Sequence, residues 1–303
     1  MPDRIGAIAD AIEVLLARRF TGRGGRADIL VGLIGRGIQQ SRTPAMHERE
    51  ASRLGMTCAY VLIDFDALGL ADDDIADALR AAARLGFSGV NVTYPFKQSV
   101  IPLLDEVAPE ARTIGAVNTV VFGPRAIGHN TDHWGFAESF RERMSAVSLE
   151  RVAMFGAGGA GSAVGAALIE LGAEEIVVVD PDAARARHLV ERFAMTGPAR
   201  LTGSEDAHAA VLAAAGIVNT TPVGMAKHPG TPFPAAWLRP EQWVADVIYF
   251  PRETELLRHA RKIGCRTLPG IGMAIGQAAR AFEHFTGRAA DMTAMADHFE
   301  AAA

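Results

Sequence analysis

The feature that most constrains this chain is a glycine-rich segment, Gly156-Ala157-Gly158-Gly159-Ala160-Gly161, placed between two apolar runs. Val152–Phe155 precedes it, small residues at Ser162–Leu171 follow, and a second apolar run, Ile176–Val179, ends in Asp180. Glycines permit a tight turn after a strand and let the backbone approach a pyrophosphate at a helix N-terminus, while an acid about 20 residues further on binds ribose hydroxyls. The pattern predicts a dinucleotide-binding unit; the alternative is a tight turn in an α/β core that binds nothing.

Composition excludes several other classes of protein. The chain has 303 residues, enough for two domains, and its 49% hydrophobic and 21% charged residues are typical of a globular protein. A net charge of −5 argues against a nucleic-acid partner, and no apolar run reaches the length of a membrane span or a signal peptide core. The two cysteines, Cys58 and Cys265, have no metal-ligand spacing, so we expect a cytoplasmic protein without a metal site.

Apolar runs alternate with helical patterns from Ile29 onward, which favours an α/β fold with a mainly parallel sheet covered by helices on both faces. A second α/β unit begins near Asp132 and contains the glycine-rich segment. We expect ligands in a cleft between the two domains, beyond the carboxyl ends of the strands. The expected strands are Ile29–Ile34, Ala59–Ile63, Gly89–Val92, Val117–Phe122, Ile217–Asn219 and Val244–Val247, and the expected helices Pro44–Leu54, Asp73–Leu85, Met273–Phe285 and Asp291–Phe299.

Three polar segments follow predicted strands of the first domain, where an α/β fold places its chemistry: Ser41-Arg42-Thr43-Pro44, Asn91–Lys97 and Gly128–Asp132. Each also has an ordinary structural interpretation. The first fits a helix N-cap followed by proline, the second ends in a solvated lysine at the start of a helix, and the third is a loop ending in an aspartate N-cap. Residue patterns alone leave both interpretations open.

The order of these segments and their amino-acid residues resemble those of the shikimate/quinate dehydrogenase family. The resemblance runs from about Ile29 to the C-terminus and implies an N-terminal substrate-binding domain, a C-terminal Rossmann-type domain and a cleft between them. It implies domains at 28–131 plus 270–303 and at 132–269, with 1–27 as an extension that ends in a flexible connection, Thr21–Arg26. The matching segments are Ser41–Pro44, Asn91–Lys97, Gly115–Thr119, Asn130–Asp132, Gly156–Gly161, Asn219–Met225 and Gly270–Gln277.

The resemblance also implies an activity: reversible oxidation of shikimate, and of quinate, to the 3-dehydro acid with a nicotinamide dinucleotide as hydride acceptor. Lys97 and Asp132 match the catalytic pair. Such a reaction needs a group that takes the hydroxyl proton, and an ammonium beside a carboxylate stabilises charge on the reacting oxygen. Which of the two carries the proton stays open. The implied substrate contacts are Ser41 and Thr43 for the carboxylate, Thr93, Asn118 and Gln277 for ring hydroxyls, and Tyr249 for a further pocket contact.

Two departures from the family pattern bear on specificity. Biosynthetic members have serine where this chain has Thr43, and threonine there resembles members that also accept quinate. NADP-dependent members have Asn-Arg-Thr where this chain has Asp180-Pro181-Asp182, and a carboxylate repels the 2′-phosphate of NADP. We therefore expect NAD rather than NADP. The implied cofactor contacts are Gly156–Gly161, Asp180, Asp182, Arg185, Thr220, Pro222, Gly224, Met225, Gly270 and Met273.

Two other functions remain as alternatives: an NADP-dependent biosynthetic shikimate dehydrogenase, since Arg185 and Arg187 follow the second strand, and a non-catalytic ligand sensor with the same fold. The pair Lys97 and Asp132 argues against the sensor, because a binding module does not require it. The expected partners are the small-molecule substrate and a second copy of the chain at most, with no nucleic acid, membrane or metal.

Overall fold

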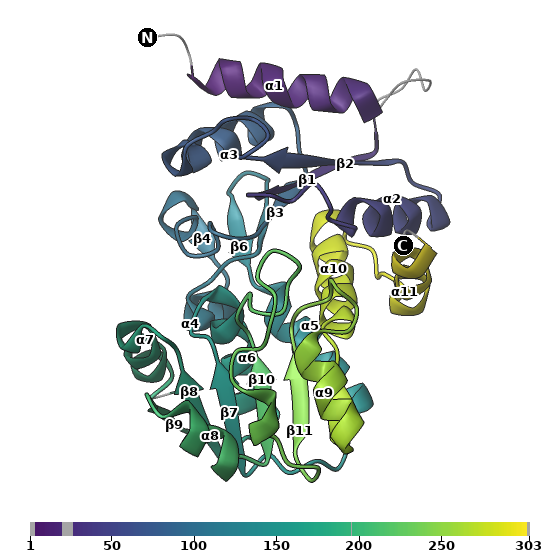
Figure 1. The fold of residues 1–303 in the computed structure, drawn as a ribbon. Helices are drawn as coiled ribbons and strands as arrows, with labels where there is room; N and C mark the ends of the chain where they lie inside the picture. Colours follow the sequence, from purple (N-terminus) through teal and green to yellow (C-terminus); the bar gives the residue numbers. More distant parts are fainter. Residues whose placement is uncertain (1–3, 20–26, 195, 302–303) are drawn as a thin grey trace. The chain divides into compact units, whose positions relative to one another are not determined.

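The computed structural model describes residues 4–19, 27–194 and 196–301, and these form two compact units. Unit 1 comprises Met1–Thr131 and Ala278–Ala303, and unit 2 comprises Asp132–Gln277. Figure 1 traces both units along the chain. The connection expected at Thr21–Arg26 lies outside the described residues.

Unit 1 is built on a six-stranded sheet in the order β2-β1-β3-β5-β6-β4. The three strands β2, β1 and β3 are parallel to one another, as expected. The sheet is mainly parallel, as expected, with the exception of β5, which is antiparallel to both β3 and β6. The short connection between β5 and β6 allows only a hairpin, because a parallel pair needs a long crossover. The strands are β1 (Ile29–Gly35), β2 (Cys58–Asp64), β3 (Gly89–Val92), β4 (Glu106–Val107), β5 (Thr119–Val121) and β6 (Ile127–His129).

Helices cover both faces of this sheet, because its strands are apolar on both sides. Val61 and Ile63 of β2 pack with α1 and α3, and Ile8 of α1 is buried in the same cluster. On the other face Tyr60 packs with Phe285 of α10. The segment before the first strand is therefore a core element of unit 1. The helices are α1 (Arg4–Arg19), α2 (Thr43–Arg53), α3 (Ile75–Arg84), α4 (Pro109–Ile114), α10 (Ile271–Thr286) and α11 (Met292–Ala301), with 3-10 turns η1 (Asp72–Asp74) and η2 (Ile101–Leu103).

The structure excludes two of the ordinary interpretations that the sequence left open. No α-helix follows Lys97: the chain continues as turns to the 3-10 turn η2. In an α-helix that began at Lys97, Pro102 would lack an amide donor and its ring would clash with the carbonyl of Gln98, so the stretch does not continue as an α-helix. Residues 128–132 are not a loop with an aspartate N-cap, because Gly128 belongs to β6 and Asp132 lies in the first turn of α5 (Thr131–Arg143).

Unit 2 has a six-stranded, fully parallel sheet in the order β12-β11-β10-β7-β8-β9. This is the Rossmann order, in which successive strands are added on one side and then on the other, and ligands bind beyond the carboxyl ends of the two central strands. Here those strands are β7 and β10. The strands are β7 (Arg151–Phe155), β8 (Glu175–Val179), β9 (Arg200–Gly203), β10 (Gly216–Asn219), β11 (Trp243–Asp246) and β12 (Arg266–Leu268).

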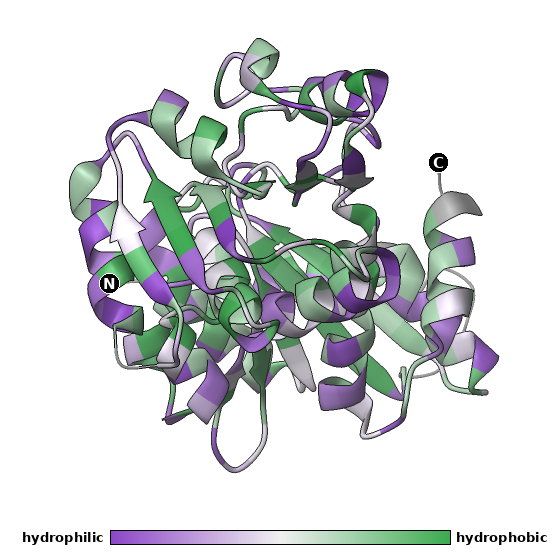
Figure 2. Ribbon diagram, turned by 90° about the horizontal axis from the view of Figure 1, so that it is seen from below, coloured by the Kyte–Doolittle hydropathy of each residue, from purple (hydrophilic) through white to green (hydrophobic). Residues whose placement is uncertain are grey.

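Two hydrophobic clusters sandwich the sheet of unit 2. One joins Met154 and Val178 to α5, α6 and α7, and the other joins Phe155 and Ile217 to α8 and α9. Figure 2 shows hydrophobic residues along most of the strands and a mixture of hydrophilic and hydrophobic residues along the helices. The remaining elements are α6 (Gly159–Glu170), α7 (Ala183–Phe193), α8 (Ala207–Ala213), η3 (Ala235–Trp237) and α9 (Glu255–Ile263).

Candidate functional site

In unit 1 the predicted substrate residues gather at the carboxyl ends of β1 and β3. The amide of Thr93 donates to the carbonyl of Ile34 at 2.9 Å. A Cβ on Gly35 would lie 2.4 Å from the Thr93 methyl group, so glycine at the end of β1 makes room for this side chain. Because β5 runs antiparallel to β3, Asn118, the residue directly before β5, lies at the same edge, and its carbonyl accepts from the Val92 amide at 2.8 Å.

Asn118 is fixed by a buried hydrogen-bond network. Its Oδ1 accepts from the backbone amide of Thr131 at 2.8 Å, and its Nδ2 donates to Thr131 Oγ1 at 3.0 Å. Asn91 supports the network, because its Nδ2 donates to Thr119 Oγ1 at 3.0 Å. Asn91 and Asn118 are both nearly inaccessible to solvent, so these bonds rigidify the edge. The network also holds Thr131, the residue directly before Asp132.

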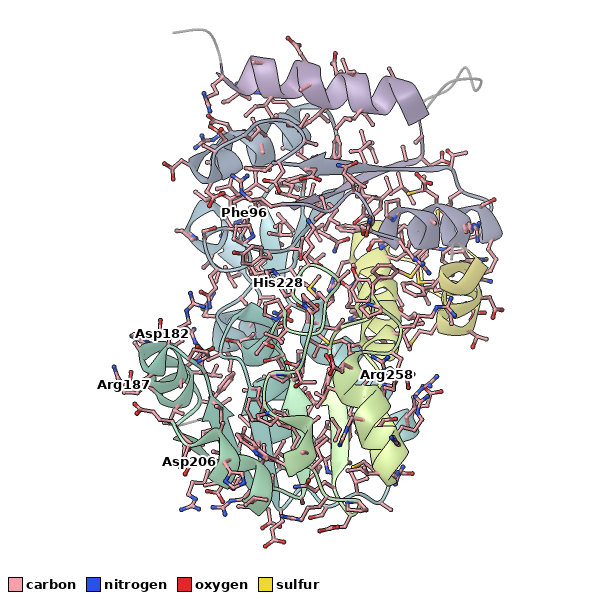
Figure 3. All side chains as sticks on the ribbon, viewed as in Figure 1. Phe96, Asp182, Arg187, Asp206, His228 and Arg258 are labelled. Atoms are coloured by element: carbon pink, nitrogen blue, oxygen red, sulfur yellow. The ribbon has the colours of Figure 1, made fainter. Side chains whose placement is uncertain are left out.

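Lys97 is anchored through its backbone and its neighbour. Its carbonyl accepts from the amide of Val117 at 2.7 Å, which ties it to the segment that carries Asn118. The ring of Phe96 is buried and lies 4.6 Å from the ring of Phe65, and its place in unit 1 is labelled in Figure 3. The Lys97 side chain is half-buried. Lys97 thus belongs to unit 1, while Asp132 is the first residue of unit 2.

The hydroxyl groups of Ser41 and Thr43 are not used to cap a helix. The N-cap of α2 is Arg42, which makes no side-chain capping bond. Instead Ser41 Oγ lies 3.2 Å from Thr43 Oγ1 and accepts weakly from the Thr43 amide at 3.4 Å. The guanidinium of Arg42 turns to α11, where it lies over the ring of Phe299. Two hydroxyl donors this close are suited to bind the two oxygens of one carboxylate.

In unit 2 the glycine-rich segment forms the tight turn between β7 and α6. Gly156 has φ +102°, a left-handed conformation that favours glycine. A Cβ on Gly161 would lie 2.1 Å from the carbonyl oxygen of Gly156, so only glycine allows this close approach. Gly158 is exposed, and a Cβ there would meet no atom within 4 Å. The N-terminus of α6 therefore faces open space, which fits the pyrophosphate of a dinucleotide.

Asp180 and Asp182 have different roles at the end of β8. Asp180 accepts from the amide of Ala157 at 2.8 Å and from that of Asp182 at 2.9 Å, so its carboxylate holds the glycine-rich turn. Each carboxylate oxygen keeps a further acceptor site for a ribose hydroxyl. Asp182, labelled in Figure 3, caps α7 by accepting from the amide of Ala184 at 2.9 Å. Arg185 pairs with Asp182 at 3.5 Å across the helix surface.

The segment after β10 carries four more predicted cofactor contacts. Thr220 Oγ1 lies 2.7 Å from the carbonyl oxygen of Phe155 and 2.9 Å from that of Gly156, which binds this segment to the glycine-rich turn. Pro222 and Gly224 shape the turn that follows, where Gly224 has φ +118°. Met225 is 41% exposed. These residues thus lie beside the central strands, where the Rossmann order places a ligand.

Asp246 organises this side of unit 2, although the sequence analysis did not single it out. Its carboxylate is buried and accepts from Thr254 Oγ1 at 2.8 Å, from the Ile248 amide at 3.0 Å and from Asn219 Nδ2 at 3.2 Å. Burial raises the pKa of Asp246 to about 6, against the opposing effect of these hydrogen bonds. Tyr249, three residues on, is 37% exposed. The signal that could have identified Asp246 is an acidic residue at the end of an apolar strand.

The last predicted contacts lie at the start of α10. A Cβ on Gly270 would lie 2.3 Å from the carbonyl oxygen of Val247, so this glycine allows α10 to begin against the end of β11. Met273 is buried in the core of unit 2 and is 7% exposed. Gln277 Nε2 donates to the carbonyl of Ala274 at 3.2 Å, which leaves its side-chain oxygen as an acceptor for a ligand.

Two histidines near these segments do not have the setting of a proton carrier. His47 is 1% exposed, and burial lowers its pKa to about 3, so it is neutral. His129 stacks on His284 with ring centroids 4.0 Å apart and lies 3.2 Å from a carboxylate oxygen of Glu110.

Within the described ranges, no cluster of three or more His, Cys, Asp or Glu side chains is arranged to hold a metal ion. The helices described there also include none that is long and apolar enough to span a bilayer.

Known protein families match both ends of the chain. A family described as "Shikimate dehydrogenase substrate binding domain" matches residues 33–120, and one described as "Shikimate 5'-dehydrogenase C-terminal domain" matches residues 270–298. The first match contains the predicted carboxylate, ring-hydroxyl and lysine positions of unit 1. The second contains Met273 and Gln277.

Curated relatives match nearly the whole chain. "Shikimate dehydrogenase (NADP(+))" of Streptomyces avermitilis is 51% identical over 278 residues, covering 90% of this chain and 96% of the relative. "Quinate/shikimate dehydrogenase (NAD(+))" of Corynebacterium glutamicum is 45% identical over 280 residues, covering 89% and 98%. The solved structure of quinate dehydrogenase from Corynebacterium glutamicum in complex with NAD has a TM-score of 0.84 and 44% identity, covering 90% of this chain and 99% of that one. The relatives thus agree on the reaction class and differ in the named cofactor.

Proposed function

The chain belongs to the shikimate/quinate dehydrogenase family, and we propose that it reversibly oxidises a ring hydroxyl of shikimate and of quinate to the 3-dehydro acid with NAD. It is an oxidoreductase that acts on a CH–OH group with a nicotinamide dinucleotide. The observation that supports an acid as substrate is that the hydroxyl oxygens of Ser41 and Thr43 lie 3.2 Å apart and neither hydroxyl caps a helix.

We propose a substrate-binding domain at 28–131 plus 270–303 and a dinucleotide-binding domain at 132–269. Ser41 and Thr43 bind the substrate carboxylate, and Thr93 and Asn118 bind ring hydroxyls. Gln277 and Tyr249 complete the substrate contacts. The open N-terminus of α6 receives the pyrophosphate, because its amides and dipole favour an anion there.

Lys97 and Asp132 act together on the reacting oxygen. A nicotinamide dinucleotide bound to unit 2 would supply the hydride acceptor for the oxidation. The Lys97 ammonium donates a hydrogen bond to the hydroxyl oxygen and stabilises the negative charge that develops as the O–H bond breaks. One member of the pair takes the proton and returns it in the reverse reaction. The hydrogen bond from the Val117 amide to the Lys97 carbonyl fixes the backbone of Lys97 within unit 1.

Asp180 supports NAD as the preferred cofactor. A carboxylate at the end of the second strand accepts hydrogen bonds from the adenosine ribose and opposes a 2′-phosphate. The rival function is an NADP-dependent biosynthetic shikimate dehydrogenase. It is favoured by the Streptomyces avermitilis relative and by the exposed Arg185 and Arg187 on α7, the latter labelled in Figure 3. We further propose that the protein is cytoplasmic and acts as a monomer or homodimer.

Alanine substitution of Lys97 and Asp132 tests the catalytic pair. Each single variant should lower kcat for shikimate by orders of magnitude, and the double variant should lose little more, since groups that act as a unit are not additive. Formation of the reduced nicotinamide is followed by its absorbance, and circular dichroism checks the fold. Lys262→Ala, an exposed lysine in the last turn of α9, is the matched control and should behave as wild type. Substantial turnover by Lys97→Ala would rule out the assigned role.

A further inference from the structure

The loop that leads to Ser41 and Thr43 is held by a single buried carboxylate. Asp64 is the last residue of β2 and pairs in register with Gly35, the last residue of β1. Both strands therefore end at the same sheet edge, and the chain leaving β1 passes beside Asp64. The Asp64 side chain is 1% exposed, which makes its hydrogen bonds part of the interior rather than of the surface.

Four donors satisfy this carboxylate, two on each oxygen. Asp64 Oδ1 accepts from the amides of Gly37 at 2.9 Å and Asp66 at 3.1 Å. Asp64 Oδ2 accepts from the amide of Ile38 at 3.0 Å and from Gln39 Nε2 at 2.9 Å. Burial raises the pKa of Asp64, but the hydrogen bonds from Gln39, Gly37, Asp66 and Ile38 outweigh this effect and leave the pKa below its ordinary value. The group is thus ionised, and three of its donors come from the loop after β1.

Hydrogen bonds continue from this loop to the proposed carboxylate contacts. The carbonyl of Ile38 accepts from the amide of Ser41 at 2.9 Å, so the position of Ser41 depends on that of Ile38. Ser41 Oγ in turn lies 3.2 Å from Thr43 Oγ1. A chain of contacts therefore runs from Asp64 through Ile38 and Ser41 to Thr43. The ionised Asp64 carboxylate only accepts hydrogen bonds, so it cannot itself bind an anion.

We propose that Asp64 is a positioning residue, which fixes the Gly37–Gln39 loop so that Ser41 and Thr43 present their hydroxyls to the carboxylate of the substrate. This role rests on the proposed function, since it presupposes a hydroxy acid as substrate. Preorganised donors bind an anion more tightly because the loop need not be ordered during binding. Asp64 thereby sets the recognition of the carboxylate and leaves the chemistry at the ring hydroxyl untouched.

Asp64→Asn is the direct test. An asparagine has nearly the same shape but only one acceptor oxygen, so its NH2 group would face two N–H donors and release part of the loop. The measured quantities are kcat and KM for shikimate and for its methyl ester, which keeps the ring and lacks the charge. We expect KM for the acid to rise about tenfold, with kcat nearly unchanged, and the preference for acid over ester to fall by a similar factor. KM for NAD should not change.

Asp66→Asn is the matched control, because only its backbone amide contacts Asp64 and its side chain pairs with Arg36 at the surface. It should keep the wild-type preference for acid over ester. If Asp64→Asn does not fold, Gln39→Ala is the deciding variant. Gln39 is exposed, and its substitution removes one of the four donors to Asp64. This variant should lower the preference for acid over ester by a smaller factor than Asp64→Asn.

An unchanged preference in Asp64→Asn, or equal losses with acid and ester, would overturn the inference and leave the proposed function standing. If Gln39→Ala is the deciding variant, an unchanged preference for acid over ester in that variant would likewise overturn the inference. A wild-type protein that turns over neither shikimate nor quinate would overturn the proposed function, and the inference with it.

Discussion

Asp180→Asn should shift the cofactor preference toward NADP. Two unit charges about 4 Å apart repel each other by about 1 kcal/mol in bulk water. Since Asp180 is only partly buried and a 2′-phosphate carries nearly two charges, we expect a penalty of about 2 kcal/mol against NADP, or roughly 30-fold in kcat/KM. Asparagine removes the charge and keeps one acceptor oxygen, so the Ala157 amide stays bonded, whereas the Asp182 amide loses its acceptor.

Steady-state kinetics with both cofactors measure this effect. The variant should use NADP roughly 30-fold better than wild type, and lose up to about 3 kcal/mol of NAD binding through its weaker bond to the ribose. The penalty against NADP in the wild-type protein should shrink at high salt, because about 1 M salt shortens the Debye length to about 3 Å. The cofactor preference of the variant should not depend on salt. Asp182→Ser is the control, since serine still caps α7. An unchanged NADP rate in Asp180→Asn would refute the reasoning.

Two further substitutions give distinct signatures. Thr43→Ser keeps the hydroxyl and removes one methyl group, so the ratio of kcat/KM for quinate to that for shikimate should change by about 1–3 kcal/mol at most, measured from initial rates; an unchanged ratio would place quinate recognition elsewhere. For Asp246, a pKa of about 6 in the folded protein against 3.8 in the unfolded chain makes the folded state hold the proton more tightly. This stabilisation is present at low pH and is lost as pH rises through about 6, for a total of about 3 kcal/mol. Urea unfolding of wild type and Asp246→Asn at about pH 4 and pH 7 should show the loss in wild type alone, and a difference between them that is independent of pH would contradict the assigned pKa.

Features that depend on local chemistry could be predicted from the sequence. The turn at Gly156–Gly161 was recognisable because its glycines meet requirements set within a few residues, namely a left-handed backbone and a close approach. The parallel strands β1, β2 and β3 were likewise predicted from apolar runs, with boundaries within one or two residues of those observed. The structure adds that Ser41 and Thr43 are not helix caps, a choice that the pattern itself left open.

Features that depend on register between distant segments could not be predicted. Asp64 finds three of its four donors in a loop 25 to 27 residues earlier in the chain, and the pairing of Gly35 with Asp64 brings them together. The reversed direction of β5 follows from the hairpin with β6, which the sequence analysis did not contain as a strand. Asp180 was expected to serve the cofactor alone, whereas its carboxylate also holds the Ala157 amide across the end of β8.

Initial rates of the purified wild-type protein with shikimate and quinate, each with NAD and with NADP, test the central claim most directly. The account predicts turnover of both acids with NAD, and a kcat/KM with NADP that is lower by roughly 30-fold because Asp180 repels the 2′-phosphate. Preference for NADP together with turnover of shikimate alone would contradict the account and identify the NADP-dependent biosynthetic enzyme instead.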